Sequence, residues 1–213
     1  MDQAVDSILR EYEKRSTEEN ERSRNMDIAE FVKHRDEFLL SVGPATGQLL
    51  NLLAKQAKSK TILEIGTSYG YSTIWLAEAA RANGGKLITL DAIADKQTYA
   101  RSQIQKAGLE GYVDFRLGDA RDSIPKIEGM VDFVLLDLWK DLYIACFDLF
   151  YPLLSPGGLV VADNMLYPEA VMSQALNYRK HVRIKRDMQS VLIPVGSGLE
   201  LSRCTRGLES LLI

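Results

Sequence analysis

Cysteine and histidine are scarce in this sequence, with two residues of each among its 213. Cys146 and Cys204 are too few and too far apart for a disulfide framework or a zinc site, and His34 and His181 cannot build a histidine-rich metal centre. The N-terminus lacks the basic start and apolar block of a secretory signal, and no apolar run approaches membrane-spanning length. We therefore expect a cytoplasmic protein that makes no membrane contact.

The chain also lacks a large excess of charge of either sign. Its formal net charge is −3, which argues against a general attraction to nucleic acid or to anionic membranes. A basic cluster at residues 179–186 is the local exception, and such clusters usually solvate one face of a helix. The length and an apolar fraction of 46% are typical of one compact domain with a full core.

Short apolar runs alternate with helical patterns through most of the chain. Strands are expected at 61–65, 86–90, 112–117, 131–137 and 158–163, with helices at 72–82, 95–107 and 142–154. This alternation predicts an α/β fold, in which a mostly parallel sheet has helices on both faces. Residues 189–195 and 199–204, separated by Gly196-Ser197-Gly198, predict a C-terminal antiparallel hairpin that brings the sheet to seven strands.

The N-terminal region, residues 1–41, is expected to be a helical segment that precedes a domain at 42–213. Its first 25 residues are highly charged, and Ile8, Leu9 and Tyr12 form only a thin apolar stripe. A helix frayed at its exposed end and a solvated arm both fit this pattern. A second helix is expected from Gly43, where leucines recur at core spacing.

A glycine turn joins the first predicted strand to its helix. Its spacing is Glu64-x-Gly66-x-x-x-Gly70, not the Gly-x-Gly-x-x-Gly of dinucleotide sites, which disfavours an NAD-dependent oxidoreductase. A pyrophosphate needs bare amides at a helix N-terminus. S-adenosylmethionine carries a sulfonium and an ammonium instead, so an acid at this turn suits it better. The turn therefore predicts a methyltransferase.

Acidic residues recur where the predicted strands end, and ligands bind at that edge of such sheets. Asp91 ends the second strand, where a carboxylate can accept hydrogen bonds from ribose hydroxyls. Asp119 ends the third, where it could accept the adenine amino group unless Ala120 or Arg121 lines the adenine. A simpler interpretation is that each aspartate caps the following helix, which becomes less convincing as acids accumulate along one edge.

A second group of polar residues follows the fourth and fifth strands. If those strands are neighbours, Asp137, Asp163 and Asn164 converge as three oxygen donors that suit Mg²⁺. Lys140 should point into the same cleft as a general base, or else pair with Asp137 or a neighbouring acid. Trp139 could line the cofactor or an aromatic substrate, or simply pack in the core.

These residues resemble those of the class I, divalent-cation-dependent O-methyltransferases, which include the catechol and caffeoyl-CoA enzymes. The resemblance runs from about residue 42 to 203, through blocks at 42–48, 64–72, 137–143, 162–164 and 194–199. It implies a Rossmann-like class I methyltransferase fold, with Lys140 as the base and Asp137, Asp163 and Asn164 as the ligands of Mg²⁺ or another divalent cation. It also implies a set of S-adenosylmethionine contacts: Val42, Glu64, Gly66, Ser68, Tyr69, Ser72, Asp91, Ala92, Asp119, Ala120, Asp137 and Trp139.

The function implied by the resemblance is S-adenosylmethionine-dependent, metal-assisted O-methylation of a small catechol-like or phenolic substrate. The resemblance also suggests a homodimer, to which the charged first helix could contribute. Glu169 and Asp187 do not align with the glutamate that catechol enzymes place near the second hydroxyl, so catechol itself stays open. The alternatives are a tRNA hydroxyuridine O-methyltransferase that uses the basic cluster, and a cofactor-binding scaffold without chemistry. The intact Asp137, Lys140, Asp163 and Asn164 argue against the scaffold.

Overall fold

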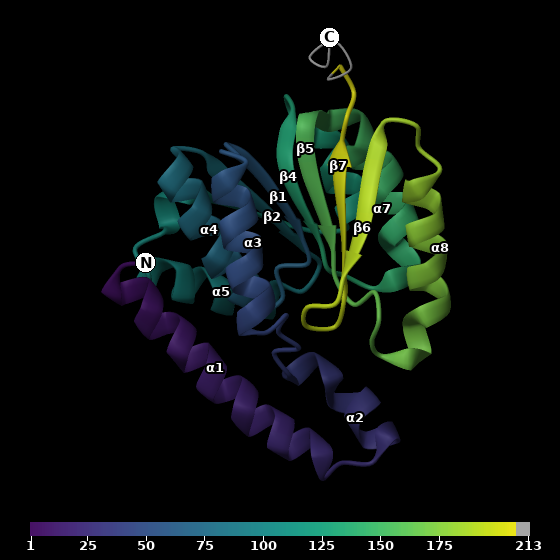
Figure 1. The fold of residues 1–213 in the computed structure, drawn as a ribbon. Helices are drawn as coiled ribbons and strands as arrows, with labels where there is room; N and C mark the ends of the chain where they lie inside the picture. The colour runs from purple at the N-terminus through teal and green to yellow at the C-terminus, as the bar shows by residue number, and fades with distance from the viewer. Residues whose placement is uncertain (208–213) are drawn as a thin grey trace.

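The computed structural model describes residues 1–207, and its strands form one mixed sheet in the order β3-β2-β1-β4-β5-β7-β6 (Figure 1). The first five strands run parallel, whereas β7 is antiparallel to both β5 and β6. This arrangement confirms the predicted fold and its closing hairpin. The strands are β1 (Thr61–Ile65), β2 (Lys86–Asp91), β3 (Val113–Leu117), β4 (Val131–Leu136), β5 (Leu154–Ala162), β6 (Met188–Ile193) and β7 (Leu199–Cys204).

Helices cover both faces of the sheet. One apolar core lies between the sheet and α1, α3, α4 and α5, and a second lies between the sheet and α6, α7 and α8. Ile62 faces the first core and Leu63 faces the second, as expected for a central strand that is buried on both sides. The helices are α1 (Gln3–Arg24), α2 (Ile28–His34), α3 (Pro44–Gln56), α4 (Tyr71–Asn83), α5 (Ala94–Lys106), α6 (Ala120–Ser123), α7 (Tyr143–Phe150) and α8 (Met172–Arg183).

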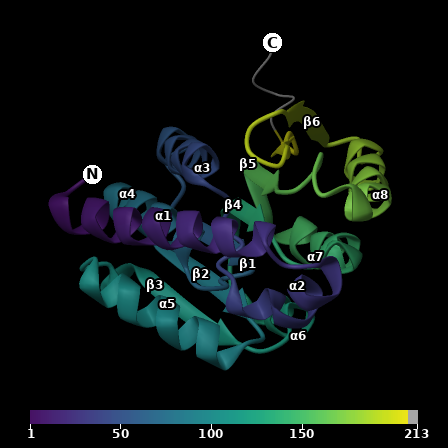
Figure 2. The same cartoon turned by 90° about the horizontal axis from the view of Figure 1, so that it is seen from below.

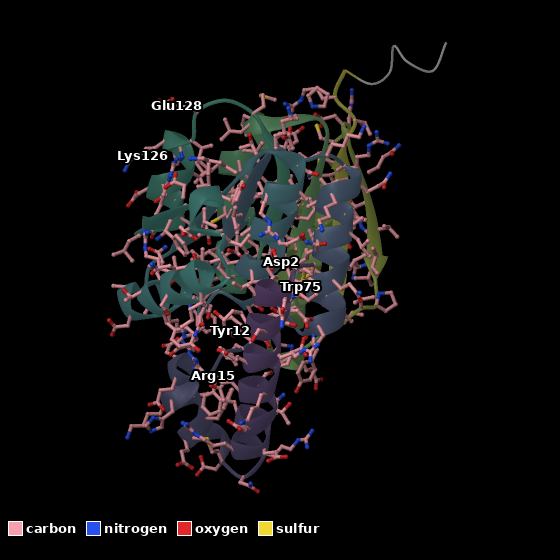
Figure 3. All side chains as sticks on the ribbon, turned by 90° about the vertical axis from the view of Figure 1, so that its left-hand side faces the viewer. Asp2, Tyr12, Arg15, Trp75, Lys126 and Glu128 are labelled. Atoms are coloured by element: carbon pink, nitrogen blue, oxygen red, sulfur yellow. The ribbon has the colours of Figure 1, made fainter. Side chains whose placement is uncertain are left out.

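The first half of α1 is anchored to the domain. Val5, Ile8, Leu9 and Tyr12 are buried in the first core, and the Tyr12 ring meets the ring of Tyr71 edge-on at 5.7 Å. Tyr12 and the cation Arg15, one turn further along, can be followed in Figure 3. The thin apolar stripe is thus sufficient to dock the helix, and the solvated-arm interpretation is wrong.

The fifth strand begins earlier than the sequence pattern indicates. It starts at Leu154, which pairs with Val131, and its register with β4 shifts before Leu159 pairs with Phe133. Gly157, with φ of +81°, lies inside this irregular stretch, where the sequence Ser155-Pro156-Gly157-Gly158 by itself predicts a turn. The preceding helix α7 is shorter than expected because Pro152 cannot donate a helical hydrogen bond, and a short 3-10 turn follows at Tyr151–Leu153.

The segment between α1 and α3 lies beneath the carboxyl ends of the parallel strands. Figure 1 shows α2 below the sheet, and in the view from below α1 and α2 lie in front of the strand ends (Figure 2). The short 3-10 turn η1 (Arg35–Glu37) follows α2 directly. The fold thus brings the N-terminal segment to the edge where the predicted site residues gather. No helix among residues 1–207 combines the length and apolar character required to span a bilayer.

Candidate active site

Gly66 allows the turn after β1, the predicted cofactor turn, to lie against the loop that carries Asp137, the first predicted metal ligand. Its φ is +110°, and a Cβ built on it would lie 1.9 Å from the backbone carbonyl oxygen of Asp137. Any side chain would therefore push the loop after β4 away from the loop after β1. The resemblance places Gly66 among the cofactor contacts, which stays a prediction; the structure shows that Gly66 also permits the close approach of another backbone segment.

Glu64 is fully buried on the α4 side of β1, and three hydroxyl groups donate to its carboxylate. Ser72 donates to Oε1, and Thr73 and Thr89 donate to Oε2, each at 2.6 Å. Burial raises the pKa of Glu64 to about 7, although the three hydrogen bonds act in the opposite direction. The acid therefore fixes the start of α4, and the structure brings predicted cofactor residues Glu64 and Ser72 together.

Asp91 organises the same turn from the end of β2. Its Oδ2 accepts a hydrogen bond from the Ser68 amide at 2.6 Å, and its Oδ1 accepts one from the Ile93 amide at 2.8 Å. Ser68 has φ of +47°, a conformation that is costly for a residue other than glycine. The carboxylate stabilises that strained turn. Ala92, the next predicted contact, is exposed beside it.

Asp119 is the N-cap of α6, as the simpler interpretation of strand-end acids expects. The Arg121 side chain and backbone amide donate to its carboxylate and hold its pKa at about 2. Ala120 is almost buried at the start of the helix, and Val42 packs partly buried against the first core. The cofactor roles of Asp119, Ala120, Val42 and the other residues of the predicted set stay predictions.

The two predicted metal acids stand at the ends of neighbouring strands. The Asp137 amide donates to Ile65 at 2.9 Å, and the Asp163 amide donates to Leu136 at 3.1 Å, so both acids continue the parallel ladders. Asp163 is buried and Asp137 is partly open to solvent. Burial raises the pKa of both carboxyl groups, to about 7 for Asp163, and the charge of Asp137 adds to the shift at Asp163.

The donor set fits a divalent cation by the chemistry of its atoms. Asp163 Oδ1 is buried and has no hydrogen-bond partner, so one carboxylate oxygen is left for a ligand. Asn164 adopts φ of +55° immediately after it and contributes an amide oxygen. Among residues 1–207, three or more His, Cys, Asp or Glu side chains do not cluster anywhere in a way that could hold a metal. The predicted site therefore requires the amide as its third donor.

Lys140 is nearly buried in a 3-10 turn after β4, and its amine is held by three acceptors. Nζ donates to Asn164 Oδ1 at 2.9 Å, to the Leu138 carbonyl at 3.3 Å, and to the Tyr143 hydroxyl. Burial lowers the pKa of this lysine, while the charges of Asp137 and Asp163 oppose the shift. The structure thus brings the predicted base to the predicted metal ligand Asn164.

Tyr143 is a site residue that the sequence analysis left without a role. It is fully buried, accepts a hydrogen bond from Lys140 Nζ, and donates one to the Asp163 backbone carbonyl at 3.3 Å. Its ring packs edge-on against Tyr178 at 5.4 Å. The residue lies in an apolar run and reads as core from sequence, but its position three residues after Lys140 was an available signal.

Two aromatic residues of the predicted cofactor set contact the N-terminal segment. The guanidinium carbon of Arg35 lies 4.2 Å from the ring centroid of Trp139, whose residue is 49% exposed. The Tyr69 hydroxyl donates to the Asp36 carbonyl at 3.0 Å. Trp139 is therefore not a core residue, and the η1 turn borders the site.

The basic cluster at 179–186 is largely paired with acids inside the protein. Arg179 and Arg183 donate to the fully buried carboxylate of Glu200 at 3.1 Å and 2.6 Å. His181 and Lys185 both contact the carboxylate of Asp148. These contacts fix α8 to the hairpin and to α7, so the cluster has a structural explanation that does not involve nucleic acid.

Comparison with known proteins gives one consistent result. The O-methyltransferase family profile matches residues 13–205. A catechol O-methyltransferase from Niastella koreensis is 39% identical over 139 residues, 63% of this chain but only 62% of that protein. Catechol O-methyltransferase B from Danio rerio is 32% identical over 209 residues, 95% of this chain and 76% of that protein.

A solved structure agrees with these sequence relationships. The O-methyltransferase TomG from Streptomyces achromogenes, solved in complex with SAM, superposes with a TM-score of 0.75 and 26% identity over 96% of this chain and 91% of its own. Both the family profile and the fold therefore cover nearly the whole chain, which confirms the resemblance noted in the sequence. This chain belongs to the O-methyltransferase family.

Proposed function

We propose that this protein is a divalent-metal-assisted, S-adenosylmethionine-dependent O-methyltransferase that methylates a hydroxyl of a small catechol-like or phenolic substrate. The observation that carries the proposal is the convergence of Asp137, Lys140, Asp163 and Asn164 at two adjacent strand ends, next to the Gly66 turn. Relatives named as catechol O-methyltransferases support the acceptor class, and TomG in complex with SAM supports the methyl donor.

The cofactor would occupy the edge formed by the turn after β1 and by Asp91. When bound, S-adenosylmethionine would supply a methyl group on its sulfonium sulfur; the acceptor oxygen would bond to that methyl carbon in line as the carbon–sulfur bond breaks and S-adenosylhomocysteine leaves. The turn is rigid because Asp91 fixes the Ser68 amide and Glu64 fixes the first turn of α4. A preformed turn of this kind orients the donor without an ordering cost at each turnover.

Asp137, Asp163 and Asn164 would hold the divalent cation. When bound, Mg²⁺ would lower the pKa of the acceptor hydroxyl and align it with the methyl group. The unpartnered Asp163 Oδ1 and the amide oxygen of Asn164 supply hard oxygen ligands of the kind that Mg²⁺ prefers. Gly66 keeps the backbone of Asp137 next to the cofactor turn, so the two sites cannot move apart independently.

Lys140 would remove the proton from the acceptor hydroxyl. Burial lowers its pKa, which increases the fraction of neutral amine near neutral pH. The Tyr143 hydroxyl and the Leu138 carbonyl fix the direction of Nζ, and the Tyr143 hydroxyl is itself tied to Asp163. The proton acceptor is thereby fixed relative to the residues that would hold the substrate oxygen.

Large exposed side chains close to the metal acids support an aromatic acceptor. Trp139 follows Asp137 by two residues, and Leu166 and Tyr167 come directly after the Asn164 segment. All three are at least 40% exposed, so their apolar surface is open to a ligand. A planar phenolic ring would cover part of this surface. We also propose that the protein is cytoplasmic and that it forms a homodimer. Size-exclusion chromatography with light scattering tests the dimer.

The proposal is tested by incubating the purified protein with S-adenosylmethionine, Mg²⁺ and catechol, and detecting the monomethyl product by mass spectrometry. Lys140→Arg keeps the positive charge, but a guanidinium stays protonated and cannot accept the proton of the acceptor hydroxyl. Turnover should therefore fall at least ~100-fold, while the affinity for S-adenosylmethionine measured by calorimetry changes little. Asp163→Asn should also abolish turnover. Full turnover by either variant would refute the assigned roles, and failure of the wild type across a panel of phenols would refute the acceptor class.

A further inference from the structure

Arg35 is a cation at the border of the site with no acidic partner among residues 1–207. Its guanidinium carbon lies 4.2 Å from the ring centroid of Trp139, a residue that stands between Asp137 and Lys140 in sequence. Arginine stacks well on tryptophan, and the stacked guanidinium keeps its N–H groups free at its edges. The arrangement therefore presents a planar donor beside an exposed aromatic ring.

Three other cations near this edge are neutralised by acids. Lys96 pairs with Asp36 at 3.1 Å, Arg121 with Asp119 at 2.6 Å, and Arg15 with Glu19 at 2.6 Å. In each pair, a carboxylate of the protein already occupies the position that an anionic ligand would take. Arg35 differs because an aromatic ring, and not an acid, holds it in place, so its charge remains available to an anion.

The backbone that follows Arg35 directly is held against the domain. The Asp36 carbonyl accepts a hydrogen bond from Tyr69 at 3.0 Å, and Glu37 pairs with Arg22 at 2.9 Å. Further along, Phe38 and Leu39 are buried. Arg35 is thus presented by an anchored turn, and binding an anion would cost little ordering of the backbone.

We propose that Arg35 is a specificity-determining residue that selects methyl acceptors carrying an anionic group, in particular an aryl carboxylate, on the aromatic ring. This inference rests on the proposed function and deepens it. The hydroxyls of such an acceptor would lie toward Asp137 and Asp163, and its carboxylate toward the Arg35 guanidinium at the Trp139 face. An arginine fork matches a carboxylate in geometry and charge. It also offsets the repulsion that Asp137 and Asp163 exert on an anionic acceptor.

The test compares catechol with 3,4-dihydroxybenzoate as paired acceptors. In the wild type kcat/KM should be higher for the carboxylated acceptor. Arg35→Ala should reduce that value by ~10-fold and change kcat/KM for catechol by less than ~2-fold, and Arg35→Glu should reduce it further. Lys33→Ala removes another exposed cation, in the last turn of α2 just before η1, and should leave the ratio of the two kcat/KM values unchanged.

A binding measurement separates this inference from the proposed function. The chain has two tryptophans, and Trp75 is buried, so a fluorescence change on titration reports chiefly on Trp139. The probes are 3,4-dimethoxybenzoate and neutral 1,2-dimethoxybenzene, neither of which has a hydroxyl to methylate. Tighter binding of the carboxylate that disappears in Arg35→Ala supports the inference even without turnover. Equal losses for both acceptors, or no preference in the wild type, would overturn it.

Discussion

Replacing Glu64 with glutamine should make the protein's stability less sensitive to pH. The carboxyl group is fully buried, and its pKa is raised from 4.5 to about 7. A raised pKa means that the folded protein holds this proton more tightly than the unfolded chain does. The stabilisation is therefore complete below about pH 4.5 and is lost as the pH rises through about 7.

The size of the effect follows from the shift. Each pKa unit corresponds to about 1.4 kcal/mol, so the full span is about 3 kcal/mol, of which about 2–3 kcal/mol falls between pH 5 and pH 8. Glutamine keeps the shape, and the hydroxyl groups of Ser72, Thr73 and Thr89 can rotate to accept from its amide. Glu64→Gln should therefore gain that amount relative to the wild type over this pH range.

The assay is urea unfolding at pH 5 and pH 8 for both proteins, followed by circular dichroism. The difference between the two proteins cancels other titrating groups, such as Asp163. Thr73→Val is a matched second variant, because it keeps the acid but removes a hydrogen bond that lowers its pKa. Its stability should fall more steeply with pH than that of the wild type. A Glu64→Gln difference that is the same at both pH values would refute the reasoning.

Three further substitutions test how the site is built. Tyr143→Phe removes the hydroxyl that orients the lysine amine, so kcat should fall ~10-fold while calorimetric affinity for S-adenosylmethionine is retained; an unchanged kcat would contradict this role. Gly66→Ala should lower the free energy of unfolding by about 2 kcal/mol more than Gly129→Ala, because both glycines have positive φ but only the first would clash; equal losses in urea titrations would count against the close backbone contact. Arg183→Ala should lower the free energy of unfolding by about 1–2 kcal/mol, because it removes one of two arginines that pair with the buried carboxylate of Glu200; an unchanged free energy of unfolding in calorimetry would contradict this.

The strand pattern was readable from sequence because the central strands are buried on both faces. Ile62 and Leu63 occupy opposite cores, so each strand reads as a short apolar run. The predicted start of the fifth strand was wrong, because strand pairing begins there before the apolar run does. At Leu154 the chain pairs with β4 before an irregular stretch that includes Gly157, and the sequence of that stretch reads as a turn.

The neighbouring positions of the two proposed metal acids could be predicted from the sequence because parallel strands end at one edge of a sheet. Asp137 and Asp163 follow adjacent strands, as the sequence analysis supposed. Tyr143 was not accessible in the same way, because a buried tyrosine in an apolar run looks like core. The contact of Arg35 with Trp139 joins distant parts of the chain, and no local pattern in the sequence indicates it.

The most direct test of the central claim is the rate of methyl transfer to catechol or 3,4-dihydroxybenzoate during titration with a chelator and then with Mg²⁺. The wild type should lose turnover as the metal is removed and regain it when Mg²⁺ is restored, because Asp137, Asp163 and Asn164 are proposed to supply the ligands. Asn164→Ala should show little recovery at the same Mg²⁺ concentration. Wild-type turnover that persists at full rate in excess chelator would contradict the account.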